Sequence, residues 1–221
     1  TGAGLGLPGV PVYLFSSSGS YLNLNKTTDS LGKATFRLPA NTYNFRADYQ
    51  GSQYWSGQSA LVRDTANPLS INTGGGIFSL TVLKSQNSPL PNTRCYLFNP
   101  TGTYLNLSAV TSSEGVVNFN LANGNYKIRV DYLGYQFWTP VFNVPTVLSD
   151  AFVLGCQDLT ISVQGLFQTP EPLAGIRAYL FTPSGSYLNL SQLTDASGNV
   201  VFNLPDQLYK VRADYLGYQF W

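Results

Sequence analysis

The sequence predicts an all-β chain built from three tandem β-sandwich repeats. Three observations support this prediction. Short motifs recur at one fixed spacing along the 221 residues. Within each recurring unit, apolar residues alternate with polar ones, which is typical of strands that are buried on one face. Turns that end in glycine separate the alternating segments, and no window shows a helical period.

The recurring motifs are separated by 83 residues. The three tryptophans give the spacing directly, because 138 − 55 and 221 − 138 both equal 83. A Tyr-Leu-Phe motif, a Tyr-Leu-Asn-Leu motif and an Arg-x-Asp-Tyr motif recur at the same spacing, starting from Tyr13, Tyr21 and Arg46. A fixed spacing of this kind indicates tandem copies of one folding unit. The expected repeats cover residues 1–74, 75–156 and 157–221.

About seven strands are expected in each repeat, which suits a Greek-key β-sandwich. In the second repeat, Tyr126, Ile128 and Val130 alternate with polar side chains, as do residues 117–121 before them. The counterparts of 117–121, which lie around Phe36 and Phe202, are expected as strands for the same reason. The expected strands of the second repeat are 78–84, 93–99, 103–110, 116–121, 125–132, 136–144 and 147–154.

The two ends of the chain hold incomplete repeats. Three full repeats need 249 residues (3 × 83), and the chain has 221. The first repeat lacks a counterpart of the opening strand, and the third stops before its final strands. One interpretation is a window from a longer array, which also fits a chain that starts at Thr1 without methionine. The alternative is donor-strand assembly, in which a neighbour supplies the missing strand. We favour the window, because neither end offers a spare segment.

The motifs of the second repeat resemble a known family. Leu80-Thr81-Val82 opens the repeat, and Pro89-Leu90-Pro91 and Cys95-Tyr96-Leu97-Phe98 follow it. Residues 117–121 and Gly124-Asn125-Tyr126 come after a turn that ends in glycine. This pattern resembles the carboxypeptidase-regulatory-like or transthyretin-like (prealbumin-like) β-sandwich and is similar to the B-type repeats of collagen adhesins. The resemblance covers nearly the whole chain. It implies Ig-like modules that act as stalks, spacers or fibre subunits of bacterial or archaeal surface proteins.

Composition argues against several functions. The 12 Lys+Arg and 11 Asp+Glu residues leave a net charge of +1, so the chain lacks the basic character of a nucleic-acid binder. The absence of histidine excludes Ser-His-Asp catalysis and histidine-ligated metals. The scattered acids form neither a glycosidase pair nor a calcium site. We expect no enzyme activity, metal or cofactor. No apolar stretch approaches the ~20 residues of a membrane-spanning helix.

Cys95 and Cys156 both fall in the second repeat, and the other repeats have no cysteine. Their joint occurrence predicts a disulfide and an oxidising compartment. The alternative is a buried thiol beside an unrelated cysteine.

Aromatic residues make up 14% of the chain, and one strand per repeat is apolar on both faces, with Tyr13 and Phe15 opposite Val12 and Leu14 in the first repeat. One face buries the core, so the other meets solvent or a partner. We expect contacts between repeats or chains, with the segments that end in tryptophan at the junctions. The alternatives are stacking on sugar rings and coverage by loops of the same repeat. The candidate interface residues are Tyr13, Phe15, Trp55, Tyr96, Phe98, Trp138, Tyr179, Phe181 and Trp221.

Two further patterns recur among the polar residues. Arginine and aspartate lie two positions apart on one strand face, as at Arg129 and Asp131. They favour a solvated face over a contact between repeats. Asn25, Asn106 and Asn189 fit the N-glycosylation pattern.

These observations predict an extracellular or cell-surface structural protein. Its modules would build a filament, stalk or surface layer by self-association, because identical units in line suit a one-dimensional array. The alternative function is an adhesin that binds carbohydrate or a host surface. The expected partners are copies of the chain itself, with glycans as the alternative.

Overall fold

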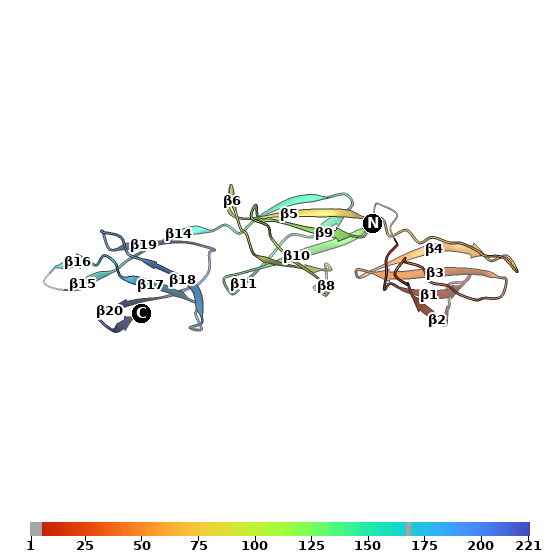
Figure 1. Ribbon diagram of the computed structural model, residues 1–221, viewed down its shortest axis with the longest axis horizontal. Helices are drawn as coiled ribbons and strands as arrows, with labels where there is room; N and C mark the ends of the chain where they lie inside the picture. The colour runs from red at the N-terminus through yellow and green to blue at the C-terminus, as the bar shows by residue number, and fades with distance from the viewer. Residues whose placement is uncertain (1–5, 167–168) are drawn as a thin grey trace.

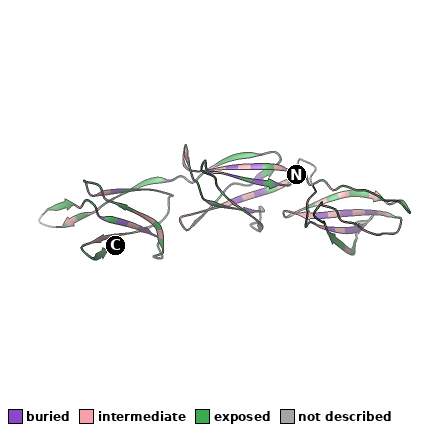
Figure 2. Ribbon diagram, viewed as in Figure 1, coloured by how far each residue is buried: buried purple, intermediate pink, exposed green. Residues whose placement is uncertain are grey.

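All regular structure in this protein is β-strand, within the residues that the computed structural model describes, 6–166 and 169–221. The strands form three bodies in a row (Figure 1). We call them the first module (β1–β4), the second module (β5–β13) and the third module (β14–β21). Each body has its own cluster of buried apolar residues, drawn purple in Figure 2. The predicted fold class, tandem β-sandwiches without helices, is confirmed.

The second module is a sandwich of two sheets. One sheet has the order β11-β10-β7-β8, and the other places β5 between β9 and β13. The chain changes sheet between β6 and β7, between β8 and β9, between β9 and β10 and between β12 and β13, as Greek-key connections do. The strands are β5 (Gly76–Ser85), β6 (Ser88–Pro89), β7 (Arg94–Phe98), β8 (Tyr104–Val110), β9 (Val116–Leu121), β10 (Gly124–Tyr132), β11 (Tyr135–Trp138), β12 (Phe142–Val144) and β13 (Ser149–Val153).

The expected strand 136–144 is divided into β11 and β12, both of which pair with β10. The interruption has a local cause. The Thr139 hydroxyl accepts the backbone N–H of Ile128 at 2.9 Å. Pro140 follows and has no N–H to donate to the ladder. The prediction of one continuous strand is therefore wrong at these positions.

The first module has one regular sheet, in the order β2-β1-β3-β4. Ala34, Phe36 and Leu38 pack against its core, but this segment is not a strand. In the other modules the equivalent strand pairs with an opening strand, and no described segment of the first module takes that place. The strand predicted here is therefore wrong. The strands are β1 (Pro11–Ser16), β2 (Tyr21–Thr27), β3 (Thr42–Tyr49) and β4 (Ser52–Ala60).

The third module repeats the main sheet in the order β18-β17-β20-β21, and a second layer pairs β14 with β19. A short hairpin of β15 and β16 extends from this layer. The strands are β14 (Gln157–Ser162), β15 (Gln164–Leu166), β16 (Pro170–Pro172), β17 (Arg177–Phe181), β18 (Tyr187–Leu193), β19 (Asn199–Leu204), β20 (Lys210–Tyr215) and β21 (Tyr218–Phe220).

Core size differs between modules. Among the described residues, the buried cluster of the second module has 14 members, whereas those of the first and third have 6 and 5. Strand alternation explains the clusters, since Tyr126, Ile128 and Val130 of β10 are at most 1% exposed while the residues between them face outward. The second module has the largest core because the strands of both its layers are paired.

Candidate functional site

An arginine lies against aromatic rings on the outer face of the main sheet in every module. In the second module the Arg129 guanidinium carbon lies 4.5 Å from the Tyr96 ring centre and 5.4 Å from that of Phe98. Trp138 lies at 6.0 Å. These distances suit cation–π attraction, which strengthens when the guanidinium loses water. The same arrangement is built from Arg46, Tyr13, Phe15 and Trp55 and from Arg212, Tyr179, Phe181 and Trp221.

An aspartate two positions further along the strand holds each of these arginines. Arg129 donates to Asp131 from Nε at 2.7 Å and from a terminal nitrogen at 3.0 Å, a two-point pairing. The two side chains are 20% and 33% exposed. The pairs therefore lie on the outer face of their own module, partly shielded by rings. The equivalent pairs are Arg46 with Asp48 and Arg212 with Asp214.

The predicted aromatic stripe is mostly covered by its own module. Phe15, Phe98 and Phe181 are each 7% exposed, so the expectation that they lie open to solvent is wrong. In the second module Phe98 lies beneath Tyr104 and Trp138, with ring centres 5.4 and 4.8 Å away. Tyr96 and its equivalents Tyr13 and Tyr179 are half-buried. The exposed members are the tryptophans Trp55, Trp138 and Trp221. Three tyrosines of the neighbouring strand, which were not among the candidates, are exposed as well: Tyr21, Tyr104 and Tyr187.

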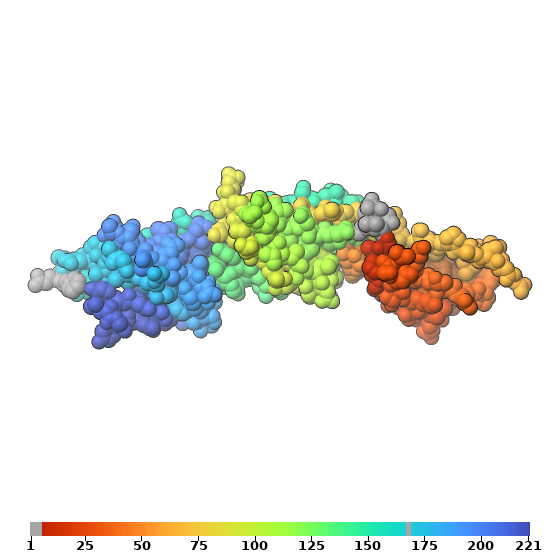
Figure 3. Space-filling view, in the orientation of Figure 1, coloured from red at the N-terminus to blue at the C-terminus, as the bar shows by residue number. Residues whose placement is uncertain are grey.

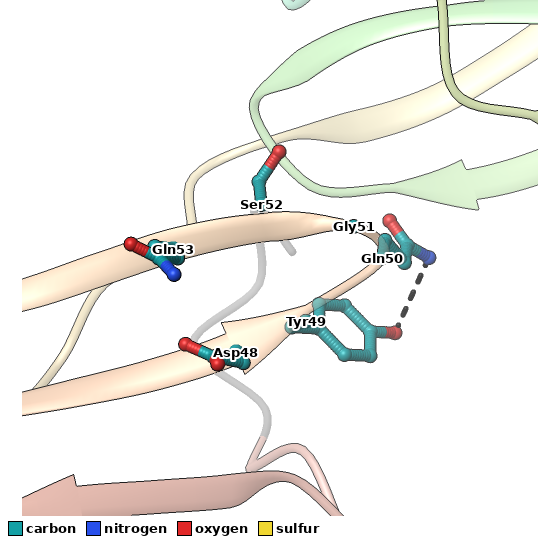
Figure 4. A pocket seen from close by; sticks show the side chains of 6 residues that line it. All are labelled: Asp48, Tyr49, Gln50, Gly51, Ser52 and Gln53. Atoms are coloured by element: carbon teal, nitrogen blue, oxygen red, sulfur yellow. Dashed lines mark hydrogen bonds between the residues drawn. The ribbon is translucent and has the colours of Figure 1, made fainter. Parts of the chain in front are cut away.

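The hairpin between β3 and β4 joins the first module to the second (Figure 4). The Gln50 side chain accepts the Ala122 N–H at 2.7 Å and donates to the Asn120 carbonyl at 3.0 Å. The Tyr54 hydroxyl donates to the Asn123 carbonyl at 2.6 Å. These bonds satisfy backbone groups at the turn between β9 and β10, so the tip of one module caps an end of the next.

The hairpin between β10 and β11 makes the equivalent joint to the third module. Leu133 at its tip packs against the third core cluster. The Tyr135 hydroxyl donates to the Leu208 carbonyl, and its ring lies edge-on to Tyr209 with centres 5.8 Å apart. The second joint uses apolar and aromatic contacts where the first uses amide hydrogen bonds. Burial raises the pKa of Tyr209, and the nearby Tyr135 hydroxyl raises it further.

Glycine at each hairpin tip brings the backbone close to the next module. Gly51 and Gly134 have φ of 76° and 77°, a left-handed conformation that glycine adopts without strain. A Cβ placed on Gly134 would lie 3.8 Å from Leu188 of β18. A Cβ on Gly51 would lie 3.1 Å from the equivalent Leu105 of β8. Both joints therefore use the same surface of the receiving module.

The joints, and not the tryptophans, mark the module junctions. The predicted junction segments end in tryptophan, yet Trp138 contacts Phe98 and Arg129 of its own module. Tyr135 at the start of the same segment makes the contact across the junction. One signal in the sequence could have located the joints. Residues 132–135 and 215–218 both read Tyr-Leu-Gly-Tyr, so a tight turn with glycine recurs between two tyrosines.

Two hollows accompany the joints. One of about 260 Å³ is lined by the tip residues Asp48–Gln53, and another of about 360 Å³ by 204–207, Tyr209 and neighbouring residues. Within the described residues, no three histidine, cysteine or acidic side chains lie close enough to hold a metal ion. Nor does that part of the chain contain a helix long and apolar enough to cross a membrane.

Cys95 and Cys156 are both buried free thiols, so the predicted disulfide is wrong. Cys95 lies in the core of the sandwich, where burial raises the pKa of its thiol to about 12. Cys156 follows β13, and burial raises the pKa of its thiol as well. Membership of one module does not fix the Cβ separation and orientation that a disulfide requires. The expected oxidising compartment therefore loses this support.

The three candidate glycosylation asparagines are exposed. Asn106 and Asn189 both have φ of 56°, in strands β8 and β18 where the pairing register shifts. Asparagine tolerates this left-handed backbone better than most residues. Their recurrence therefore has a conformational cause. Asn25 lies elsewhere in its module and donates to the Tyr21 hydroxyl at 3.1 Å. Glycosylation stays a prediction.

Comparisons with known proteins give partial structural matches. No family model matches the chain, and no curated protein matches it. The Bacillus anthracis TIE protein is 18% identical over 98% of this chain and 44% of that chain, with a TM-score of 0.35. A streptococcal ancillary pilin is 14% identical over 92% of this chain and 81% of that chain, with a TM-score of 0.31.

The major pilin subunit BcpA of Bacillus cereus is 12% identical over 66% of this chain and 54% of that chain, with a TM-score of 0.30. This chain spans less than half of the TIE protein, at 44%. With TM-scores below 0.5, these matches assign neither a family nor a function. The transthyretin-like resemblance therefore remains a prediction at the level of family.

Proposed function

We propose that this chain is an extracellular structural protein whose modules form a stalk, filament or surface layer by self-association. The observation that supports the proposal is the repeated joint. A hairpin tip of one module contacts the same surface of the next at both boundaries. The modules consequently lie in a row (Figure 3), and each contacts only its neighbours.

The sameness of the modules supports the proposal further. A ligand site normally distinguishes one copy by its loops or its charged groups. Here the arginine, its aspartate and the surrounding rings recur in all three copies with nearly equal distances, from 4.5 to 4.9 Å for the nearest ring. Equivalent copies of one arrangement are expected in a structural spacer, whereas a catalytic site would distinguish one copy from the others. The free thiols are buried and have no histidine partner, since the chain has none.

Electron microscopy of the purified chain over a range of concentrations tests this function. We expect short rods at low concentration and longer threads or arrays at high concentration. Rods follow from the joints, and threads follow from association of their ends. Chains that remain dispersed at every concentration would contradict self-association. Antibody labelling of intact, unpermeabilised cells tests the proposed location, and labelling only after permeabilisation would contradict it.

A carbohydrate-binding adhesin is the second candidate. The observation that favours it is the exposure of the tryptophans, 47% for Trp55, 39% for Trp138 and 66% for Trp221. An exposed indole face suits stacking on a sugar ring. Binding on a glycan array that falls after Trp138→Ala would support this function. Absence of binding across a broad array would contradict it.

A further inference from the structure

Positive charge gathers on the outer face of the main sheet in the second module. Arg94 of β7 and Lys127 and Arg129 of β10 alternate with core residues, so they project from this face. Asp131 is the only acidic residue in the four strands of this sheet, all of which the structure describes. Both of its oxygens accept hydrogen bonds from Arg129. Arg94 and Lys127 therefore give this face an excess of positive charge.

Neither of these two cations has an acidic partner. Among the described residues, the ion pairs include neither Arg94 nor Lys127. Arg94 lies opposite Asp131 in the register of β7 and β10, but its guanidinium donates to the Ser108 hydroxyl at 3.3 Å. The Lys127 ammonium lies over the Trp138 ring, 4.8 Å from its centre. An anionic group from outside the chain can therefore meet either cation without displacing an aspartate or a glutamate.

Exposed aromatic rings lie beside these charges. Tyr104 and Trp138 are 38% and 39% exposed, and their ring centres lie 5.4 and 4.8 Å from that of the buried Phe98. They belong to β8 and β11, the two outermost strands of the sheet order. Each combines an apolar ring with one hydrogen-bonding group. A sugar ring, which offers C–H groups and hydroxyls together, matches this combination.

The first module lacks both cations at the equivalent positions. Pro11 and Asn44 stand 83 residues before Arg94 and Lys127. The first module nevertheless keeps the paired arginine and aspartate and an exposed tryptophan, Trp55. Exposed rings are thus common to the two modules, and the two cations distinguish the second from the first.

We propose that the outer sheet face of the second module binds an acidic oligosaccharide, a chain of sugar rings that carry carboxylates. The sugar rings would lie against Tyr104 and Trp138, and a carboxylate would pair with Lys127. The excess positive charge would attract the ligand, and salt would weaken this attraction. A nucleic-acid strand fits less well, because it carries a phosphate at every nucleotide and the face offers two unpaired cations. This inference rests on the second candidate function, carbohydrate binding, and names the class of glycan.

An NMR titration of the full chain with an oligomer of galacturonic acid tests this inference. The indole N–H signals report the modules separately, because Trp55 packs on the first module and Trp138 on the second. The Trp138 signal should shift at concentrations about two- to fivefold below those that shift Trp55, the ratio expected for one exposed ion pair. The methyl ester of the same oligomer keeps the sugar rings without the charge, and it should show no preference for Trp138.

Three variants place the effect at one side chain. Lys127→Gln should weaken binding at Trp138 about two- to fivefold, because it removes the charge beside the indole. The matched control is Lys84→Gln, which removes an equal charge from β5 in the other sheet of the same module and should bind like the wild type. Asn44→Lys should bring the response of Trp55 toward that of Trp138. Circular dichroism verifies the fold of each variant.

Several outcomes would overturn the inference. These are equal titration of Trp55 and Trp138, equal weakening by Lys84→Gln and Lys127→Gln, and tighter binding of the methyl ester or of single-stranded oligodeoxythymidine than of the acidic oligomer. Binding of neutral glycans where acidic ones fail would overturn it while leaving carbohydrate binding standing. A chain that binds neither kind of glycan would overturn both the inference and the second candidate function, and it would leave the proposed structural role untouched.

Discussion

The arginine on the outer face of each module is fixed by an anion along its strand and by rings around it. Asp131 supplies two oxygens to Arg129, and Tyr96 and Phe98 lie within 5.4 Å of its guanidinium. Side-chain exposure of 20% keeps much of the water away. A pair in this setting contributes more to stability than an exposed ion pair does.

Arg129→Met should therefore destabilise the second module by about 1–2 kcal/mol, the sum expected for a shielded cation–π contact and a lost ion pair. Arg129→Lys should recover only part of this, because lysine lacks the planar fork. Thermal unfolding followed by tryptophan fluorescence measures the change. The control is Arg63→Met, since Arg63 and Asp64 are 86% and 88% exposed. An equal effect at the two sites would contradict this role for the rings.

Acid should loosen the turn that Asp29 organises. Its carboxylate accepts the backbone N–H groups of Lys33 and Leu31, and these bonds lower the pKa of Asp29 below 3.8. A depressed folded pKa means that the stabilisation is present above the unfolded value and is lost as pH falls through the folded value. The amide NMR shifts of both partners should titrate with a midpoint below 3.8, and Asp29→Asn should abolish the transition. A midpoint above 3.8 would contradict the bonding.

The two thiols should be slow to react in the folded protein. Burial raises the pKa of both, to about 12 for Cys95, and little thiolate forms at neutral pH. We expect two labelled cysteines per chain after alkylation in denaturant without reductant, and little labelling before unfolding. Detection of no labelled cysteine in denaturant would restore the disulfide.

At the scale of strands, alternation predicted most elements and pairing decided the exceptions. The sequence pattern located β7, β8, β9 and β10 to within about two residues. The same pattern at Phe36 gave no strand, because a strand needs a partner that the pattern does not contain. The break at Thr139 depended on a side-chain bond to Ile128, which alternation does not encode. The joints depended on contacts between modules that no local pattern specifies.

Amide hydrogen exchange should differ between residues 33–38 and their counterparts β9 and β19. The amides of β9 and β19 that pair with β5 and β14 should be at least about tenfold better protected than those of residues 33–38. The reason is that 33–38 lies over the first core without a ladder among the described residues. Mass spectrometry of peptic fragments measures the difference, and β9 serves as the internal reference. Equal protection in all three segments would show that 33–38 is paired in solution.

At the scale of the whole molecule, three separate cores are linked by two docked hairpins. The repeat length predicted the number of bodies, and the composition argued against catalysis. The contacts between modules were harder to predict from the sequence. Gln50 and Leu133 occupy equivalent hairpin tips, yet Gln50 forms hydrogen bonds and Leu133 makes an apolar contact. A shared backbone conformation, and not a shared side chain, makes the joints alike.

The parallel pairing of β5 with β13 has a mechanical consequence. These are the first and last strands of the second module, paired side by side from Ser79 with Ser149 to Leu83 with Val153. Tension that enters at the start of β5 and leaves at the end of β13 pulls them in opposite directions along their length. All the bonds of that ladder then bear load together in shear, whereas a peeled hairpin breaks them one at a time. In an optical trap the second module should therefore rupture at higher force than the first, and equal rupture forces would refute this clamp.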